Sequence, residues 1–331
     1  MNLQETAIGL DIGTSRLVTA RKPGKTYQFQ TQLNAFLTLP FSKLTEGVLR
    51  REEVPHECQD GDLLIPGNES ERFANLFRLE TRRPMTRGTL NPDETSGLTV
   101  IRKIIRSLLG PEEGNGRRLC FSMPGVSSGS HDSLTYHEAA IRSILTEMGY
   151  EVTNINEGLA VVLAELEDSN YTGIGISCGG GMCNACLAYL SIPVFSFSVP
   201  KGGDFIDSSA ASVAGEGATR VRAIKEQSFH FNGFFNDKIQ QALSIYYEDM
   251  ISGITNALKE YLSKAKNVPR LDRPIPIVLS GGSAMPAGFR DRFEKMLVPA
   301  DLPIAISEVR MATEPLHSTA KGALISALAE I

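Results

Sequence analysis

Three glycine-rich segments, far apart in the chain, contain residue types that could hold a phosphorylated ligand. They are residues 8–15 (IGLDIGTS), 174–181 (IGISCGGG) and 277–283 (IVLSGGS), and each begins with an apolar run typical of a buried strand. Glycine has no Cβ and tolerates positive φ, so successive backbone N–H groups in such turns can point at an anion. The three turns together predict two similar halves that close on one phosphate-bearing ligand.

The first turn also contains residues that suit a metal ion. Asp11, Thr14 and Ser15 place one carboxylate and two hydroxyls around Gly13, which suits hydrated Mg²⁺ beside phosphates. An ordinary hairpin turn would explain the same residues, because short glycine motifs often match by chance. The chain has neither a P-loop nor a dinucleotide fingerprint, so a nucleotide site here would be of another kind.

Length and composition limit the class of protein. A chain of 331 residues with 42% hydrophobic residues can bury a large core and is expected to form about two domains. The net charge of -5 argues against a nucleic-acid partner. No apolar stretch approaches the ~20 residues of a membrane span, so no direct membrane insertion is expected. Five cysteines, and a first strand that leaves no room for a signal peptide, favour the reducing cytoplasm.

Hydrophobic periodicity predicts an α/β protein. The expected strands cover residues 7–10, 17–20, 119–123, 151–155, 171–177, 186–190, 194–199 and 275–279. The expected helices cover residues 98–109, 136–148, 159–166, 238–263, 289–297 and 319–329. A strand-rich start with a glycine turn, followed by helices, occurs twice, which predicts two related halves.

The turns and the segments between them resemble the actin, sugar-kinase and heat-shock-chaperone superfamily of ATPases. Within it, the chain is similar to the bacterial actins of the MreB and MamK branch. Besides the three turns, the matching segments are residues 83–88 (RPMTRG), 123–125 (MPG), 156–158 (NEG), 200–204 (PKGGD) and 320–323 (AKGA). The resemblance covers nearly the whole chain.

The resemblance implies an actin-like fold. Two related mixed-sheet α/β domains, each with a smaller subdomain, would hold a nucleotide in the cleft between them. Domain I would comprise residues 1–150 plus 317–331, with a peripheral subdomain at about 22–95. Domain II would comprise residues 151–316, with a mainly helical subdomain at about 205–264.

The resemblance also implies a site for ATP or GTP with Mg²⁺. Glu157 falls where these proteins orient or activate the attacking water, and Asp11 would hold the metal through water. A carboxylate at a helix N-terminus explains Glu157 equally simply, and a solvated helix charge explains Lys225. The implied nucleotide-binding residues are Gly13, Thr14, Ser15, Arg16, Gly179, Gly180, Gly181, Gly202, Gly203, Asp204, Lys225, Gly281, Gly282, Ser283 and Met285.

The second turn departs from the family pattern Asp-x-Gly-Gly-Gly-Thr-Thr. Ser177 replaces a carboxylate that helps to hold the metal's water shell, and Met182 replaces a hydroxyl. Arg222 stands where the family usually has glutamate, which puts the ribose contacts in doubt. We expect nucleotide binding to survive these changes and hydrolysis to be slow.

The cysteines around the second turn offer a different interpretation. Cys178, Cys183 and Cys186 have the spacing of a plant-type iron–sulfur loop, with Cys58 or Cys120 as a fourth ligand. A strand over 183–190 would place Cys183 and Cys186 on opposite faces of a sheet, where they could not hold one cluster. Small core residues are therefore the favoured interpretation.

The expected function is that of a cytoskeletal protein. ATP·Mg²⁺ binding would close the cleft and favour head-to-tail self-association into filaments, with weak ATPase activity and a cargo or adaptor protein as a further partner. One alternative is a nucleotide-gated adaptor that does not polymerise. Another is a small-molecule kinase of the same superfamily, although no substrate-base aspartate stands in a fitting motif.

Overall fold

Two five-stranded mixed sheets with the same strand arrangement form the centre of the molecule. The computed structural model describes residues 7–110, 114–126, 131–231, 234–235, 237–265, 269, 271 and 273–329. The first sheet has the order β10-β9-β1-β2-β3 and the second β13-β12-β11-β14-β15. In each, three antiparallel strands are extended by two strands parallel to the first of them.

Eight of the ten strands match the predicted ones, whereas the edge strands β3 and β15, in which at least half of the residues are polar or charged, were not predicted. The first sheet contains β1 (Ala7–Ile12), β2 (Arg16–Arg21), β3 (Gln28–Leu33), β9 (Arg118–Met123) and β10 (Glu151–Asn156). The second contains β11 (Gly173–Cys178), β12 (Cys183–Tyr189), β13 (Ile192–Val199), β14 (Ile275–Ser280) and β15 (Ile306–Met311). The first glycine turn joins β1 to β2 and the second joins β11 to β12, so they occupy equivalent places. The predicted α/β class and the twofold repeat are confirmed.

Each sheet has its own hydrophobic core on its outer face. The first core packs β1 and β9 against α3 (Gly97–Leu109) and α4 (His131–Glu147). The second packs β11 and β14 against α8 (Lys238–Lys264) and α9 (Phe289–Leu297). The short 3-10 helices η2 (Gly282–Ala284) and η3 (Val298–Ala300) follow β14 and α9.

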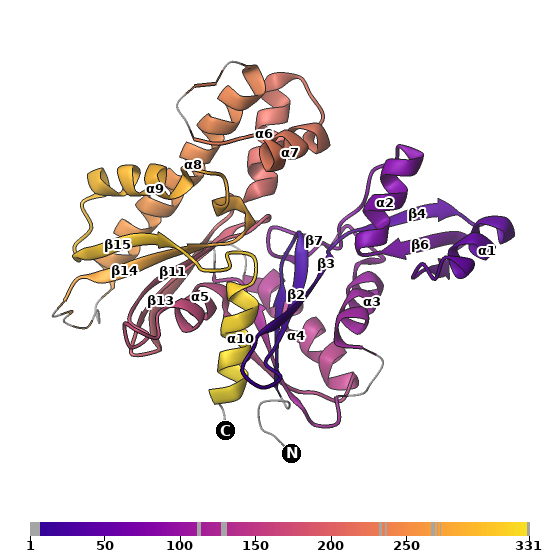
Figure 1. Cartoon of the computed structure of the whole chain (residues 1–331), viewed down its shortest axis with the longest axis horizontal. Helices are drawn as coiled ribbons and strands as arrows, with labels where there is room; N and C mark the ends of the chain where they lie inside the picture. Colours follow the sequence, from indigo (N-terminus) through magenta and orange to yellow (C-terminus); the bar gives the residue numbers. More distant parts are fainter. Residues whose placement is uncertain are drawn as a thin grey trace.

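Two helices, α5 (Glu157–Glu165) and α10 (Ser318–Ala329), lie between the sheets and pack on each other (Figure 1). Glycines allow the close approach. A Cβ on Gly322 of α10 would lie 1.8 Å from the carbonyl oxygen of Ala160 in α5, and one on Gly9 of β1 would lie 2.1 Å from that of Ala320. The two halves therefore meet through backbones in direct contact.

Helix α5 begins two residues before its predicted start because its first turn is capped. The Asn156 side-chain oxygen accepts hydrogen bonds from the N–H groups of Gly158 (2.9 Å) and Leu159 (3.2 Å). This cap satisfies backbone donors that would otherwise lack partners. It also fixes Glu157 as the first helical residue, at the junction of the two halves.

A smaller unit extends from each half (Figure 1). One contains the three-stranded sheet β4-β6-β5 with two helices; its elements are β4 (Phe36–Pro40), α1 (Lys43–Arg51), β5 (Glu57–Gln59), β6 (Asp62–Pro66) and α2 (Asn68–Phe77). The hairpin of β7 (Met85–Thr86) and β8 (Thr89–Leu90) follows it. The other unit is helical and contains α6 (Gly203–Ala214) and α7 (Ala218–Gln227), packed against α8.

The first sheet includes β10, which the expected boundary at 150/151 assigned to the second domain. We therefore propose that the first domain runs to Asn156 and that α5 begins the second. Among the described residues, no helix is long and apolar enough to cross a membrane.

Candidate functional site

A cavity of about 610 Å³ lies between the two halves and is lined by all three glycine turns. This volume is within the range of small-molecule and cofactor sites. All the predicted site residues except Gly202 line it. Part of the lining, which we term the apolar wall, consists of Phe229, Tyr247, Met285, Pro286 and Ala287.

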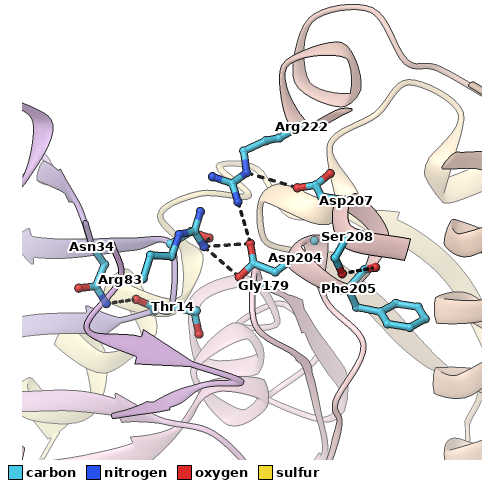
Figure 2. A network of polar contacts seen from close by, with 12 residues as sticks. Thr14, Asn34, Arg83, Gly179, Asp204, Phe205, Asp207, Ser208 and Arg222 are labelled. Atoms are coloured by element: carbon cyan, nitrogen blue, oxygen red, sulfur yellow. Dashed lines mark hydrogen bonds and ion pairs between the residues drawn. The ribbon is translucent and has the colours of Figure 1, made fainter. Parts of the chain in front are cut away.

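The first turn is fixed by hydrogen bonds from neighbouring segments. The Asn34 side chain donates to the Gly13 carbonyl (2.8 Å; Figure 2), and the Gly13 N–H donates to the Arg16 carbonyl (3.0 Å). The Thr14 hydroxyl accepts from the Gly88 N–H (3.0 Å). The turn is thus held in one shape by its own β1–β2 hairpin, by Asn34 and by the β7–β8 hairpin.

The second turn is supported from behind by the start of α6. The N–H groups of Gly203 and Asp204 donate to the carbonyls of Gly179 (3.0 Å) and Gly180 (2.8 Å). A Cβ on Gly202 would lie 2.4 Å from the Gly180 carbonyl oxygen. Gly202 therefore belongs to the support of the turn rather than to the cavity wall, and its glycine is required by this close packing.

The tips of the first two turns touch each other. A Cβ on Gly180 would lie 2.0 Å from the Ser15 hydroxyl oxygen, and one on Gly181 would lie 2.3 Å from that of Thr14. A Cβ on Gly181 would also lie 2.7 Å from the Gly88 backbone nitrogen, so no side chain fits at that position. Gly180 and Gly181 thus allow the two halves to come close together, in addition to shaping the β11–β12 hairpin.

The third turn is tied to the second. The Ser283 hydroxyl donates to the Gly179 carbonyl (2.8 Å), and the Gly281 N–H donates to the Pro315 carbonyl (2.8 Å). Gly281 has a φ of +91°, and a Cβ there would lie 2.3 Å from the Cys178 carbonyl oxygen. All three turns therefore form one connected wall.

Two carboxyl groups, those of half-buried Asp11 and buried Glu157, line the cavity. Asp11 accepts a hydrogen bond from the Ser122 hydroxyl (2.7 Å). Glu157 accepts from the Ser177 hydroxyl (3.0 Å) and the Asn184 amide (2.8 Å) through the same oxygen. The sequence thus located both carboxyls, and the structure brings them together.

Burial shifts the titration of this pair. Loss of solvation raises the pKa of Asp11 to about 6, although the Ser122 hydrogen bond opposes the change. Burial, and then the charge of Asp11, raises the pKa of Glu157 to about 8, against hydrogen bonds from Ser177 and Asn184. Burial and mutual repulsion therefore disfavour the state in which both carboxyls are ionised.

The carboxyl pair fits a divalent cation. A cation beside it would favour the ionised forms that burial disfavours. Mg²⁺ commonly uses one or two carboxylates together with substrate phosphates and waters. Among the described residues, no group of three or more His, Cys, Asp or Glu side chains could hold a metal by itself. The donor set thus suits a metal carried in with phosphates.

Charged side chains from both halves gather around Asp204 (Figure 2). Arg83 Nη1 donates to both oxygens of Asp204 (2.9 Å each), and Arg222 Nη2 donates to one of them (3.3 Å). Asp207 accepts from Arg222 Nε (3.3 Å) and from Lys225 Nζ (2.8 Å). Lys225 is therefore a buried member of an ion-pair group rather than a solvated helix charge.

The predicted strand over 186–190 is present as β12, which begins three residues earlier and so includes Cys183 as well as Cys186. Three positions apart, these side chains lie on opposite faces of the sheet. Both are fully buried; the Cys183 thiol donates to the Lys201 carbonyl (3.2 Å), and burial raises the pKa of Cys186 to about 12. The two thiols are part of the core of the second half.

Sequence reasoning missed several polar groups of the site. Of these, Asn184 could have been identified from the sequence, because it is a polar residue in an otherwise apolar strand and buried polar groups need partners. Its side-chain oxygen accepts hydrogen bonds from the Gly125 N–H (3.0 Å) and the Ser198 hydroxyl. These contacts orient the amide towards Glu157. Arg83 and Asp207 were also missed as parts of the site.

A family model for Volactin matches residues 6–327. The chain belongs to the Volactin family. No curated protein sequence matches this family member.

Solved structures identify its fold. A MamK double helical filament superposes with a TM-score of 0.71 at 18% identity, covering 98% of each chain. MreB 5 of Spiroplasma citri bound to AMPPNP gives 0.63 at 14% identity, covering 96% of this chain and 94% of its own. The ethanolamine utilization protein EutJ from Carboxydothermus hydrogenoformans gives 0.56 at 16% identity, covering 96% and 88%. This member of the Volactin family therefore has an actin-like fold similar to MamK and MreB, as predicted.

Proposed function

We propose that this chain binds a nucleoside triphosphate with Mg²⁺ in the central cavity and polymerises into nucleotide-dependent filaments, with slow hydrolysis. The observation that carries the proposal is the meeting of two equivalent glycine turns over a cavity. That cavity is lined by a carboxyl pair and by an apolar wall. A triphosphate would lie along the turns, with its base against the apolar wall.

The chain's own residues would contribute binding and orientation rather than covalent catalysis. A bound ATP supplies a phosphoanhydride bond, whose cleavage depends mainly on positioning and on stabilisation of charge. Backbone N–H groups of residues 14–16 and 180–181 would bind the phosphates, since those of Gly13 and Gly179 are used within their own hairpins. Asp11 would hold Mg²⁺ through water. Glu157, fixed by Ser177 and Asn184, would orient the attacking water.

Closure of the cleft would link binding to assembly. The contacts between the turns and the ion pair of Arg83 with Asp204 join the two halves. A ligand that binds better when these contacts form would shift the chain towards the closed state. Head-to-tail contacts between closed chains are heterologous and generate open filaments. The likeness to a MamK filament supports this proposal, in which the polymer would be cytoplasmic and would carry a cargo or adaptor protein.

A nucleotide-gated adaptor that does not polymerise is the second candidate. Ser177 favours it, because a hydroxyl bonded to Glu157 replaces a group that would help to hold Mg²⁺. Met182 favours it too: it is buried, and its Sδ would lie 2.9 Å from a Cβ on Gly88, so this side chain fills space between the halves. Both features weaken hydrolysis more directly than binding.

Sedimentation with electron microscopy, over a range of protein concentrations, separates the two candidates. Filaments that form with ATP and Mg²⁺ and are absent without nucleotide would support the cytoskeletal function. Calorimetric binding of ATP without any filaments would instead leave the adaptor. A chain that binds neither ATP nor GTP would refute both.

A further inference from the structure

Arg83 lies where the two glycine turns meet, and it contacts both halves of the molecule (Figure 2). Its Nη1 donates to the Ser15 hydroxyl of the first turn (3.1 Å) and to Asp204, which follows the glycines that support the second turn (2.9 Å). The side chain is 22% exposed and lines the central cavity. A phosphate group bound by both turns would therefore lie within reach of its guanidinium.

The ion pairs around Arg83 leave cationic charge in excess. Arg83, Arg222 and Lys225 share the two carboxylates of Asp204 and Asp207, and Asp204 is divided between both arginines. Burial lowers the pKa of Arg83, and the charge of Asp204 opposes this only in part. One more anion beside the guanidinium would complete the pairing.

The guanidinium has free capacity for that anion. Within the described part of the chain, every hydrogen bond of Arg83 is made by Nη1. Arginine carries five N–H donors in a planar fork that matches phosphate oxygens in pairs. Its remaining donors could accept a phosphate without loss of the Ser15 contact.

The two halves of the molecule contribute different parts of the cavity lining. Phe229 and Ala287, which suit a base, belong to the second half, whereas the first turn with Ser15 belongs to the first half. A phosphate chain that extends from a base held by the second half would reach the first turn with its last group. The group beside Arg83 is then the terminal one.

We propose that Arg83 binds the terminal phosphate of a nucleoside triphosphate directly and so distinguishes the triphosphate from the diphosphate. This inference rests on the proposed nucleotide site and adds a specificity-determining residue to it. Arg83 is also attached to the unit formed by β4, β5 and β6, because its neighbour Arg82 exchanges backbone hydrogen bonds with Phe36 of β4 (2.8 and 2.9 Å).

The test compares the affinities of AMPPNP·Mg²⁺ and ADP·Mg²⁺ by calorimetry in matched variants. For Arg83→Gln we expect AMPPNP binding to weaken by about 10-fold or more, the scale of a lost charge-assisted hydrogen bond, and ADP binding by less than about 3-fold. Arg83→Lys should lose part of the preference for AMPPNP over ADP, because lysine keeps the positive charge but lacks the planar guanidinium with its paired donors. Retained ADP binding shows that each variant is folded.

Two controls isolate the phosphate contact. Arg82→Gln removes a neighbouring arginine that pairs with Glu94 away from the cavity, and it should change both affinities by less than about 2-fold. Asp204→Asn breaks the ion pair across the cleft but keeps Arg83, so the preference for AMPPNP should persist. Equal weakening of AMPPNP and ADP in Arg83→Gln, reproduced by Asp204→Asn, would overturn the inference and make Arg83 a closure contact only. Failure of the wild-type chain to bind either nucleotide would instead overturn the proposed site.

Discussion

The close contact between helices α5 and α10 predicts that a side chain at Gly322 lowers the stability of the protein. Alanine at Gly322 would place a Cβ 1.8 Å from the Ala160 carbonyl oxygen and 2.4 Å from its carbonyl carbon. Real Cβ atoms stay beyond 3.0 Å, so the helices would have to separate by at least the difference, 1.2 Å. Both atoms that clash belong to rigid helical backbone, and neither can rotate away.

The size of the effect follows from two opposing contributions. Replacement of glycine by alanine within a helix contributes about 1 kcal/mol of stability. Overpacking of a closed interface costs about 1–3 kcal/mol, and a clash of backbone with backbone lies at or beyond the upper end. We therefore expect Gly322→Ala to lower the free energy of unfolding by about 2 kcal/mol.

Gly47 offers the matched control. It lies in helix α1, and a Cβ there would meet nothing within 4 Å. Gly47→Ala should therefore gain up to about 1 kcal/mol. Urea denaturation followed by circular dichroism measures both variants, through shifts of the midpoint at constant slope. A Gly322→Ala midpoint equal to or above that of the wild type would refute the packing described for α5 and α10.

Three further predictions concern the cavity and the core. Gly181→Ala would place a Cβ 2.3 Å from the Thr14 hydroxyl oxygen and should weaken ATP binding by about 10-fold or more in calorimetry. Gly217→Ala, with nothing within 4 Å, should leave that affinity unchanged. Glu157→Gln should bind ATP normally but release phosphate about 100-fold more slowly in a coupled assay, and an unchanged rate would remove Glu157 from its proposed role. Burial lowers the pKa of His137 to about 4. The free energy of unfolding should therefore decrease as the pH falls from about 6.5 to 4, because over this range only the unfolded chain binds a proton at His137. In urea denaturation at the two pH values, His137→Leu should lose about 3 kcal/mol less stability than the wild type between them. An equal loss in the variant and the wild type would contradict a lowered pKa of His137.

Local sequence patterns were sufficient to predict eight of the ten strands of the two central sheets, the glycine turns and the positions of the two carboxyls. They did not predict the edge strands β3 and β15, in which at least half of the residues are polar or charged. Asp11 and Glu157 each end or follow a predicted strand, and parallel strands of one sheet bring such positions to the same edge. Glycine turns after apolar runs are local signals as well, so both halves could be recognised without any long-range information.

The contacts between the halves could not be predicted in the same way. Arg83 and Asp204 are 121 positions apart, and their pairing depends on how far the cleft is closed. The reason for glycine at Gly202 and Gly322 is likewise a neighbour from a distant element, either the Gly180 carbonyl or that of Ala160. Such requirements follow from the packing of whole elements, which residue spacing along the chain does not encode.

We propose that one nucleotide, bound between the two glycine turns, governs assembly. Electron cryomicroscopy of the chain incubated with AMPPNP and Mg²⁺ is the decisive measurement. We expect filaments whose subunits carry nucleotide density between residues 13–16 and 179–181, with the base against Phe229 and Met285. Filaments with an empty cavity, or nucleotide bound elsewhere on the chain, would contradict it.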